Sequence, residues 1–235
     1  MATIDLHIHS NYSDGKLSPK EIIDEAKKKK VKTIAIADHD TLDAYTEELF
    51  KYAKDNDIQL IPAVEISTKT NKVGIHILGY NIDIKNNNLQ KKLKELRNSR
   101  HDYLHNVSNK LIKLGYIVDV KELDKIDAVT KAHISEQIVK SKENEKLLLQ
   151  NFGHMPTKGE FIETMMNENC PAYVKKASIT PLEAATLIRE ANGKVILAHP
   201  VAYTYEDSLS DIKIIDIINN IKADGIESYY IYIYR

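Results

Sequence analysis

Short apolar runs alternate with amphipathic helical patterns along this chain, and that alternation restricts its fold more than any other feature. Strands are expected at residues 3–8, 33–37, 58–66, 73–80, 194–198 and 225–234. Most of these runs are apolar on both faces, which is typical of buried parallel strands. The pattern therefore predicts an α/β fold in which βα units surround a mostly parallel sheet.

The same capping-box sequence marks the expected start of two helices. A Ser or Thr precedes a proline and stands three residues before a glutamate, in Ser18-Pro19-x-Glu21 and again in Thr180-Pro181-x-Glu183. The hydroxyl and the carboxylate cap each other's backbone N–H groups, and proline suits the first helical position. A further helix is expected from about residue 41 to 54.

The middle of the chain changes character at residue 89. From there to residue 169 the sequence is charged and helix-periodic, without a convincing strand. We interpret residues 89–169 as a helical insertion, or cap domain, between a first barrel segment, residues 1–88, and a second, residues 170–235.

Composition excludes several classes of protein. The 33 Lys and Arg balance 34 Asp and Glu, so a net charge of -1 provides no global field to hold a nucleic-acid backbone. The single cysteine, Cys170, rules out an internal disulfide framework and an all-thiolate zinc site, and we interpret it as a core thiol. No apolar stretch approaches the roughly 20 residues of a membrane span, so a soluble cytoplasmic protein is expected.

Histidines and carboxylates recur at or near the ends of the expected strands. His7 and His9 face the same way at the end of the first strand. The others are His39 after the second strand, Glu65 at the end of the third, His76 within the fourth and His199 after the fifth. Taken singly, each has an ordinary alternative, such as a hydrogen-bonded core histidine or a polar loop residue.

Taken together, these side chains indicate a metal site. The carboxyl ends of parallel strands are where α/β folds keep their chemistry, and a buried Glu65 needs a cation beside it. Imidazole and carboxylate ligands without thiolate suit Zn, Mn, Fe or Ni, and a carboxylate can bridge two ions. Paired ions of this kind promote phosphoryl transfer to water.

The same residues resemble the PHP family of phosphoesterases, named for polymerase and histidinol phosphatase. The matching segments are Asp5-Leu-His-Ile-His-Ser10, Ser13-Asp14-Gly15, Ala37-Asp-His39-Asp, Ala63-Val-Glu65-Ile-Ser, His76, Leu197-Ala-His199-Pro, Lys131-Ala-His133-Ile and Pro171-Ala-Tyr-Val174. The likeness covers nearly the whole chain. It is strongest to short enzymes that act on nucleoside monophosphates and 3',5'-nucleoside bisphosphates.

The resemblance implies a distorted (β/α)7 TIM-like barrel that holds two or three divalent ions of Mn, Fe or Zn. It assigns His7 and His9 to one metal, with Glu65 bridging to a second metal that His76 and His199 also hold. A third metal falls to Asp14 and His39. The implied mechanism is attack on phosphorus by a metal-bound hydroxide.

The chain departs from the family pattern at its end. Family members continue into another strand that ends in an Asp-x-His pair, whereas this sequence stops at Arg235. The uncovered, tyrosine-rich segment 229–234 is a sticky strand edge of the kind that native proteins protect. We therefore expect a truncated chain that lacks the C-terminal part of its barrel.

Substrate contacts are predicted in and beside the insertion. By family likeness, His133 and Lys131 at a helix start are candidates for phosphate, with an ordinary helix-start residue as the alternative. Further candidates for an anionic substrate are Arg97, Arg100, Lys175 and Lys176. The pair His101 and His105, spaced as on one helix face, is interpreted as solvent-exposed, as are His154 and Asp211.

The predicted function is hydrolysis of small nucleotide phosphomonoesters, AMP or a 3',5'-nucleoside bisphosphate, extending to 5'-3' exoribonuclease action on RNA 5' ends. One alternative keeps the site and changes the substrate to histidinol phosphate. Another is a catalytically silent metal-binding module that lacks the last Asp-x-His ligands. No membrane partner is expected.

Overall fold

The computed structural model describes residues 3–70, 73–126, 129–175, 178–206 and 210–228. The chain forms two compact units, Met1–Leu96 with Ser178–Arg235 and Arg97–Ala177. Each unit has its own apolar core. None of the helices in these described ranges is both long and apolar enough to cross a lipid bilayer.

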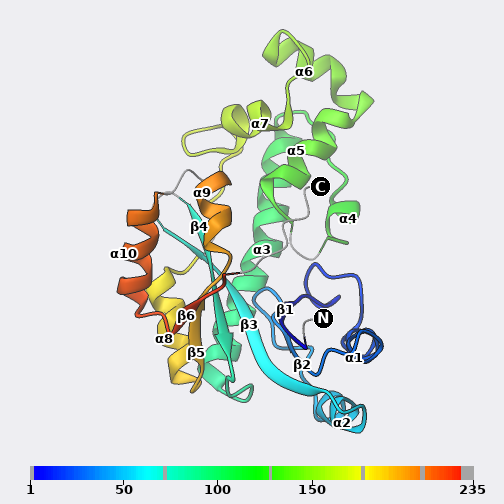
Figure 1. Ribbon diagram of the computed structural model, residues 1–235. Helices are drawn as coiled ribbons and strands as arrows, with labels where there is room; N and C mark the ends of the chain where they lie inside the picture. The colour runs from blue at the N-terminus through cyan, green and yellow to red at the C-terminus, as the bar shows by residue number, and fades with distance from the viewer. Residues whose placement is uncertain (1–2, 71–72, 127–128, 176–177, 207–209, 229–235) are drawn as a thin grey trace. The chain divides into compact units, whose positions relative to one another are not determined.

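A curled sheet organises the first unit and forms a half-barrel (Figure 1). In the described ranges its six strands are neighbours in chain order: β1 (Ile4–Ile8), β2 (Thr33–Ile36), β3 (Gln59–Lys69), β4 (Gly74–Tyr80), β5 (Lys194–Leu197) and β6 (Gly225–Ile226). This arrangement confirms the predicted α/β class and is compatible with a distorted TIM-like barrel. The part of the predicted last strand at residues 229–234 lies outside the described residues.

The strand directions correct one prediction. β1, β2 and β3 run parallel, as do β5 and β6, but β4 is antiparallel to both of its neighbours. The expectation of a parallel strand at residues 73–80 is therefore wrong. Only residues 70–73 separate β3 from β4, and a parallel crossover needs a dozen residues or more.

Several helices of the first unit begin at side-chain caps. They are α1 (Pro19–Lys28), α2 (Glu47–Asp55), the start of α3 (Asn87–Lys113), α8 (Pro181–Glu190), α9 (Pro200–Glu206) and α10 (Asp211–Ile221). Both predicted capping boxes are present, at Ser18 and at Thr180. The helix expected from residue 41 begins only at Glu47, because the Thr46 hydroxyl accepts the Leu49 N–H at 3.1 Å and caps it there.

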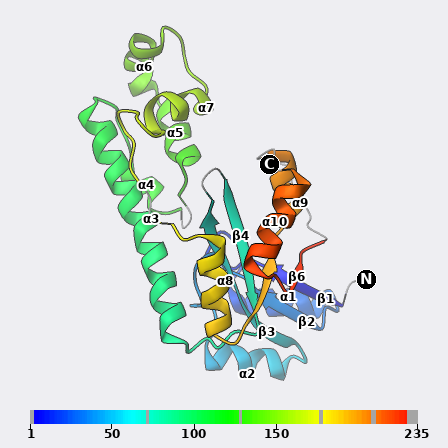
Figure 2. The ribbon, with the colours of Figure 1, turned by 90° about the vertical axis from the view of Figure 1, so that its left-hand side faces the viewer.

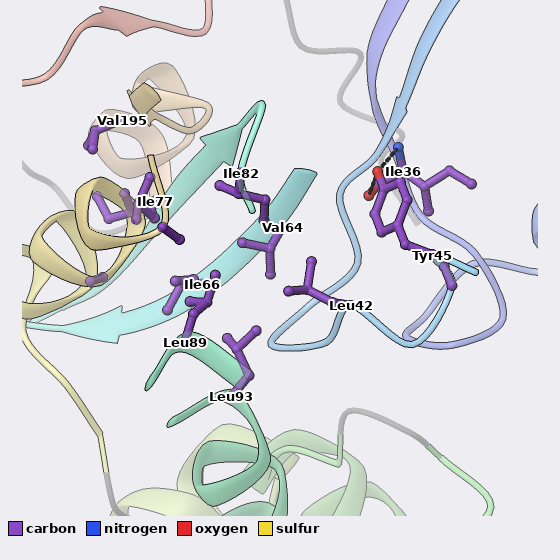
Figure 3. Close-up of a cluster of buried hydrophobic side chains, with 14 of the residues drawn as sticks. Ile36, Leu42, Tyr45, Val64, Ile66, Ile77, Ile82, Leu89, Leu93 and Val195 are labelled. Atoms are coloured by element: carbon purple, nitrogen blue, oxygen red, sulfur yellow. Dashed lines mark hydrogen bonds between the residues drawn. The ribbon is translucent and has the colours of Figure 1, made fainter. Parts of the chain in front are cut away.

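The apolar core of this unit fixes which face of β3 points toward the site. Val64 and Ile66 pack against Leu89 and Leu93 of α3 (Figure 3). Because side chains alternate along a strand, Glu65 points to the opposite face. Ala63 shares that face with Glu65, and it packs with Ala35 and Ala37 in a second, smaller apolar cluster.

Helix α8 covers the sheet beside β4 (Figure 2). A Cβ added at Gly79 would lie 2.9 Å from Cγ1 of Ile188, so the absence of a side chain permits this close approach. The contact holds β4 in register with β5, where Gly79 pairs with Val195. The position of His76 on β4 is thus set by packing on the far side of the sheet.

The Arg97–Ala177 unit consists of helices joined by turns and loops in its described residues. It contains the rest of α3 together with α4 (Val120–Leu123), α5 (Lys131–Lys140), η1 (Lys142–Asn144), α6 (Glu145–Phe152), α7 (Lys158–Phe161) and η2 (Ile162–Met166). Its core gathers Leu104, Leu111, Ile134 and Phe161. Cys170 is half-buried, with its Sγ 3.1 Å from the Glu163 carbonyl oxygen, so the prediction of a core thiol is wrong. The insertion bounds 89–169 stay a prediction.

Candidate metal centre

The sheet presents predicted ligands at the same edge from separate elements. His7 lies on β1 and His9 directly follows it, while His39 follows β2. Glu65 lies on β3, and His76 lies on the antiparallel strand β4. His199 comes two residues after β5, with a positive φ of 27° that turns the chain sharply there.

The Glu65 carboxylate is the centre of this arrangement. It is 1% exposed, and five imidazole nitrogens lie within 3.3 Å of its two oxygens. Oε1 is 3.0 Å from Nδ1 of His76 and 2.9 Å from Nε2 of His199. Oε2 contacts the remaining three imidazoles at 3.2–3.3 Å, from His7, His9 and His39.

Asp14 joins the cluster from a loop after β1. Its Oδ1 lies 3.3 Å from Nδ1 of His9, and its Oδ2 lies 3.9 Å from Nε2 of His39. These three side chains form one of three groups whose ligand atoms all lie within 4.8 Å of one another. The other two are His7 with His9 and Glu65, and His39 with Glu65 and His76. The structure thus brings all seven predicted ligands together, and it also places His39 against Glu65.

A buried carboxylate holds the Asp14 loop in place. Asp38 is 1% exposed and accepts hydrogen bonds from the Ser10 N–H at 2.7 Å, the Ser10 hydroxyl at 2.6 Å and the Ser13 hydroxyl at 2.6 Å. The loop also passes close to its own strand, because a Cβ at Gly15 would lie 2.0 Å from the His9 carbonyl oxygen. Asp38 therefore couples the loop of Asp14 to the strand end that carries His39.

The electrostatics of the cluster favour a carboxylate that is ionised and an imidazole that is neutral. Burial alone would raise the pKa of Glu65, but the surrounding imidazoles, led by His39 and His76, hold that pKa well below its usual range. Burial lowers the pKa of His39 to about 3, against the attraction of Glu65. At neutral pH the site therefore combines the negative charge of Glu65 with a neutral His39, whose lone pair is available to a metal ion. His7 differs, because its burial, which lowers its pKa, is outweighed by hydrogen bonds to Glu227 and Glu65 that raise its pKa to about 10, so an ion that binds there must displace a proton.

The donor atoms fit the dimensions of a divalent ion. Tetrahedral ligands about 2.1 Å from zinc stand about 3.4 Å apart. Nε2 of His7 is 3.2 Å from Nε2 of His9, and both are 3.3 Å from Oε2 of Glu65. A carboxylate has about four lone-pair sites, so hydrogen bonding alone does not account for five imidazoles around one of them.

Sequence reasoning missed Glu227. This residue follows β6, and its Oε1 lies 2.9 Å from Nδ1 of His7. Its Oε2 accepts the backbone N–H of His199 at 2.8 Å. The signal was present, because Ile226-Glu227 repeats the pattern of an apolar strand residue followed by glutamate seen at Val64-Glu65.

The predicted substrate contacts belong to the Arg97–Ala177 unit. Lys131 donates to Oδ1 of Asn167 at 2.8 Å, and His133 caps α5 through Nδ1, which accepts the Thr130 N–H at 3.2 Å. Arg97 is half-buried and Lys175 is exposed. The structure does not describe the side chains of Arg100 and His101 or any part of Lys176. The substrate roles stay predictions.

The remaining polar candidates make ordinary contacts. Nε2 of His105 lies 3.5 Å from Oδ2 of Asp124, and Nε2 of His154 lies 3.1 Å from Glu160. Asp211 is exposed in the first turn of α10. All three residues are exposed, which confirms the interpretation of His105, His154 and Asp211 as surface residues.

The fold and the cluster define an α/β protein with a histidine-rich candidate metal centre at the rim of its sheet, and comparison with known proteins identifies the family. Residues 5–180 match the PHP domain, and the chain belongs to that family. The resemblance predicted from the sequence is confirmed.

Similar proteins extend this assignment. A 5'-3' exoribonuclease of Haemophilus influenzae is 32% identical over 201 residues, which are 85% of this chain and 69% of that protein. A 3',5'-nucleoside bisphosphate phosphatase of Chromobacterium violaceum is 26% identical over 92% of this chain and 73% of that protein. The chain thus spans about two thirds to three quarters of the length of these relatives.

The solved structures agree on the fold. An amidohydrolase of Chromobacterium violaceum, solved with bound sulfate, superimposes with a TM-score of 0.68 at 24% identity. The match covers 96% of this chain and 76% of the solved chain. The fold of this chain is therefore shared with a protein of known structure.

Proposed function

We propose that this chain is a metal-dependent phosphoesterase that hydrolyses small nucleotide phosphomonoesters, AMP or a 3',5'-nucleoside bisphosphate. The observation that carries the proposal is the convergence of five imidazoles on the buried carboxylate of Glu65. Relatives named as a bisphosphate phosphatase and an exoribonuclease support the substrate class.

The ligands have distinct roles in this proposal. His7, His9 and Glu65 would hold one ion, Glu65 would share a second with His76 and His199, and Asp14 with His39 would hold a third. Divalent Mn, Fe or Zn in such a site activates water for attack on phosphorus and neutralises the phosphoryl oxygens. The protein's own part is to fix the donors: β1, β3 and β4 are rigid strands, and Asp38 anchors the loop of Asp14.

The helical unit supplies the proposed substrate contacts. Lys131 and His133 lie in the first turn of α5, and a helix N-terminus together with a lysine favours a phosphate group. Arg97, Arg100 and Lys175 are further proposed anion contacts. The finer fold, a (β/α)7 barrel with residues 89–169 as its insertion, belongs to the same proposal.

Action on RNA 5' ends is the second proposed activity. The exoribonuclease relatives favour it, and hydrolysis of a phosphodiester uses the same electrostatic stabilisation as hydrolysis of a monoester. The net charge of -1 argues that RNA would be held near its 5' end rather than along its length.

Phosphate release tests the proposal. The purified 235-residue chain, loaded with Mn, Fe or Zn, is given AMP, adenosine 3',5'-bisphosphate and histidinol phosphate, and free phosphate is measured. A 5'-phosphorylated RNA oligonucleotide is followed in parallel by gel electrophoresis. We expect turnover of the nucleotides, and at least about 100-fold less after Glu65→Gln, because that change removes the shared ligand charge.

Matched variants and substrates make the outcomes distinct. His154→Ala removes an exposed histidine that contacts Glu160 at the surface and should leave turnover unchanged. Preferred cleavage of histidinol phosphate would replace the nucleotide assignment. A chain that holds fewer than two ions and releases no phosphate from any substrate would refute the proposal in favour of a silent metal-binding module.

A further inference from the structure

We infer that Glu227 is a positioning residue for the metal centre, holding the imidazole of His7 and the backbone of His199 in one orientation. The inference rests on the proposed function and deepens it, because it names a side chain outside the predicted ligand set. Glu227 is half-buried and directly follows the short strand β6, which carries none of the predicted ligands.

The two oxygens of Glu227 have separate partners. Oε1 lies 2.9 Å from Nδ1 of His7, and Oε2 accepts the N–H of His199 at 2.8 Å. His7 lies on β1, whereas His199 lies beyond β5 with a φ of 27°, in a region that residues other than glycine adopt at a cost. A single carboxylate therefore ties together two ligands from distant parts of the chain.

The geometry assigns the nitrogens of His7 to different tasks. A carboxylate beside Nδ1 keeps a proton there, since an ionised carboxylate is only an acceptor. Nε2 faces His9 and the carboxylate of Glu65, so it would supply its lone pair once an ion displaces the proton from that side of the ring. Such a carboxylate partner fixes both the tautomer and the ring plane of a ligand histidine, and it increases the basicity of the ligand atom.

Glu227 is placed to support a ligand and not to act as one. Its Oε1 lies against Nδ1, on the other side of the imidazole from the Nε2 atom that faces Glu65. Among the described residues, the groups with metal-ligand spacing do not include Glu227. Within the described part of the sheet β6 pairs with β5, and Glu227 follows it on the Nδ1 side of His7.

Metal affinity tests this inference without relying on activity. Zinc binding is measured by competition with a chromophoric chelator for the wild-type chain, Glu227→Gln and Asp224→Asn. Glutamine offers one oxygen where two donors need acceptors, so Glu227→Gln should weaken the tightest site by roughly 10- to 100-fold. Asp224 is the matched control: it accepts the Val195 N–H at 2.9 Å and contacts Lys194, so it supports the same strands without touching a ligand.

A spectroscopic measurement separates positioning from general stability. In the zinc-loaded wild-type chain, the Nδ1 proton of His7 should give a slowly exchanging, downfield imidazole resonance in proton NMR, assigned by its loss in His7→Gln. In Glu227→Gln we expect this resonance to shift upfield or to broaden through exchange, whereas in Asp224→Asn it should not move. Far-UV circular dichroism confirms that each variant folds.

The results distinguish the two levels of the argument. Equal zinc affinity and an unmoved His7 resonance in Glu227→Gln would overturn the role of Glu227 while leaving the metal centre intact. An equal loss in Asp224→Asn would also overturn it, by showing that β6 acts only through stability. A wild-type chain that binds no ion would refute the proposed function itself.

Discussion

The hydroxyl of Tyr45 fills a gap between β2 and β3, directly before the strand ends that carry the site. Pro62 interrupts β3 in the interior of the sheet, where a proline cannot donate to the ladder. The Tyr45 oxygen accepts the N–H groups of Ile36 at 3.0 Å and Ala63 at 2.9 Å, and it lies 2.7 Å and 2.9 Å from the carbonyl oxygens of Ile36 and Ile61 (Figure 3). Tyr45→Phe removes a single oxygen atom, but we expect it to lower the free energy of unfolding substantially, because several backbone groups lose their hydrogen-bond partner.

The magnitude follows from the groups left behind. Tyr45 is 7% exposed, so water does not readily replace its hydroxyl. Each buried N–H group that loses its acceptor costs about 1–3 kcal/mol, and the two N–H groups of Ile36 and Ala63 together give about 2–6 kcal/mol. Typical domains are stable by only about 5–15 kcal/mol, so the change is a large fraction of the total.

Urea denaturation followed by far-UV circular dichroism measures this loss, since the chain contains no tryptophan to report by fluorescence. The matched control is Tyr52→Phe, which removes a hydroxyl that donates to Oδ1 of Asp24 at the surface, at 2.7 Å. We expect the control to lose less than about 1 kcal/mol. If Tyr45→Phe also loses less than about 1 kcal/mol, the reasoning about the interrupted ladder is wrong.

Further changes probe the loop, a cap and the charges of the site. Gly15→Ala should displace the Asp14 loop and lower zinc affinity in chelator competition, because its Cβ would lie 2.0 Å from a backbone oxygen. Asp38→Asn should cost about 1–3 kcal/mol in urea denaturation, since one of its buried acceptor oxygens becomes a donor. Thr180→Ala should cost about 1 kcal/mol in the same assay through loss of the α8 cap. Burial lowers the pKa of His7, but hydrogen bonds to two glutamates outweigh it and raise that pKa from 6.5 to about 10. Its stabilisation of the metal-free protein should be complete below pH 6.5 and disappear as the pH rises through about 10, and His7→Gln should flatten this slope in urea midpoints.

Most of the correct predictions from the sequence came from the hydrophobic periodicity of the strands and from the polar residues at their ends. An apolar run followed by an imidazole or a carboxylate places that side chain at a sheet edge whatever the tertiary detail, which is why His39, Glu65 and His199 were found. The helix starts at Ser18 and Thr180 were equally clear, because a capping box is a local hydrogen-bonding arrangement.

The features that sequence did not reveal depend on contacts between distant residues. An apolar strand has the same pattern whether it runs parallel or antiparallel, so the direction of β4 required the length of its connection to β3. The contact of Glu227 with His7 joins residues 220 positions apart. The Tyr45 hydroxyl likewise makes hydrogen bonds at the point where Pro62 has no N–H to donate, and this role follows from the pairing of β2 with β3.

These long-range contacts explain why the cluster forms only in the folded chain. The five imidazoles around Glu65 come from β1 and its end, the end of β2, β4 and the turn after β5, so no short segment contains a complete site. An ion that binds this cluster would bind the native state and not the unfolded chain, and the free energy of binding would add to the free energy of unfolding. Without an ion, the cluster is unfavourable, because five imidazoles around one buried carboxylate repel one another when protonated and lose their contact with water. The residues that anchor the ligands, Asp38 and Glu227 among them, are thus part of the chemistry of the site even though they hold no metal themselves.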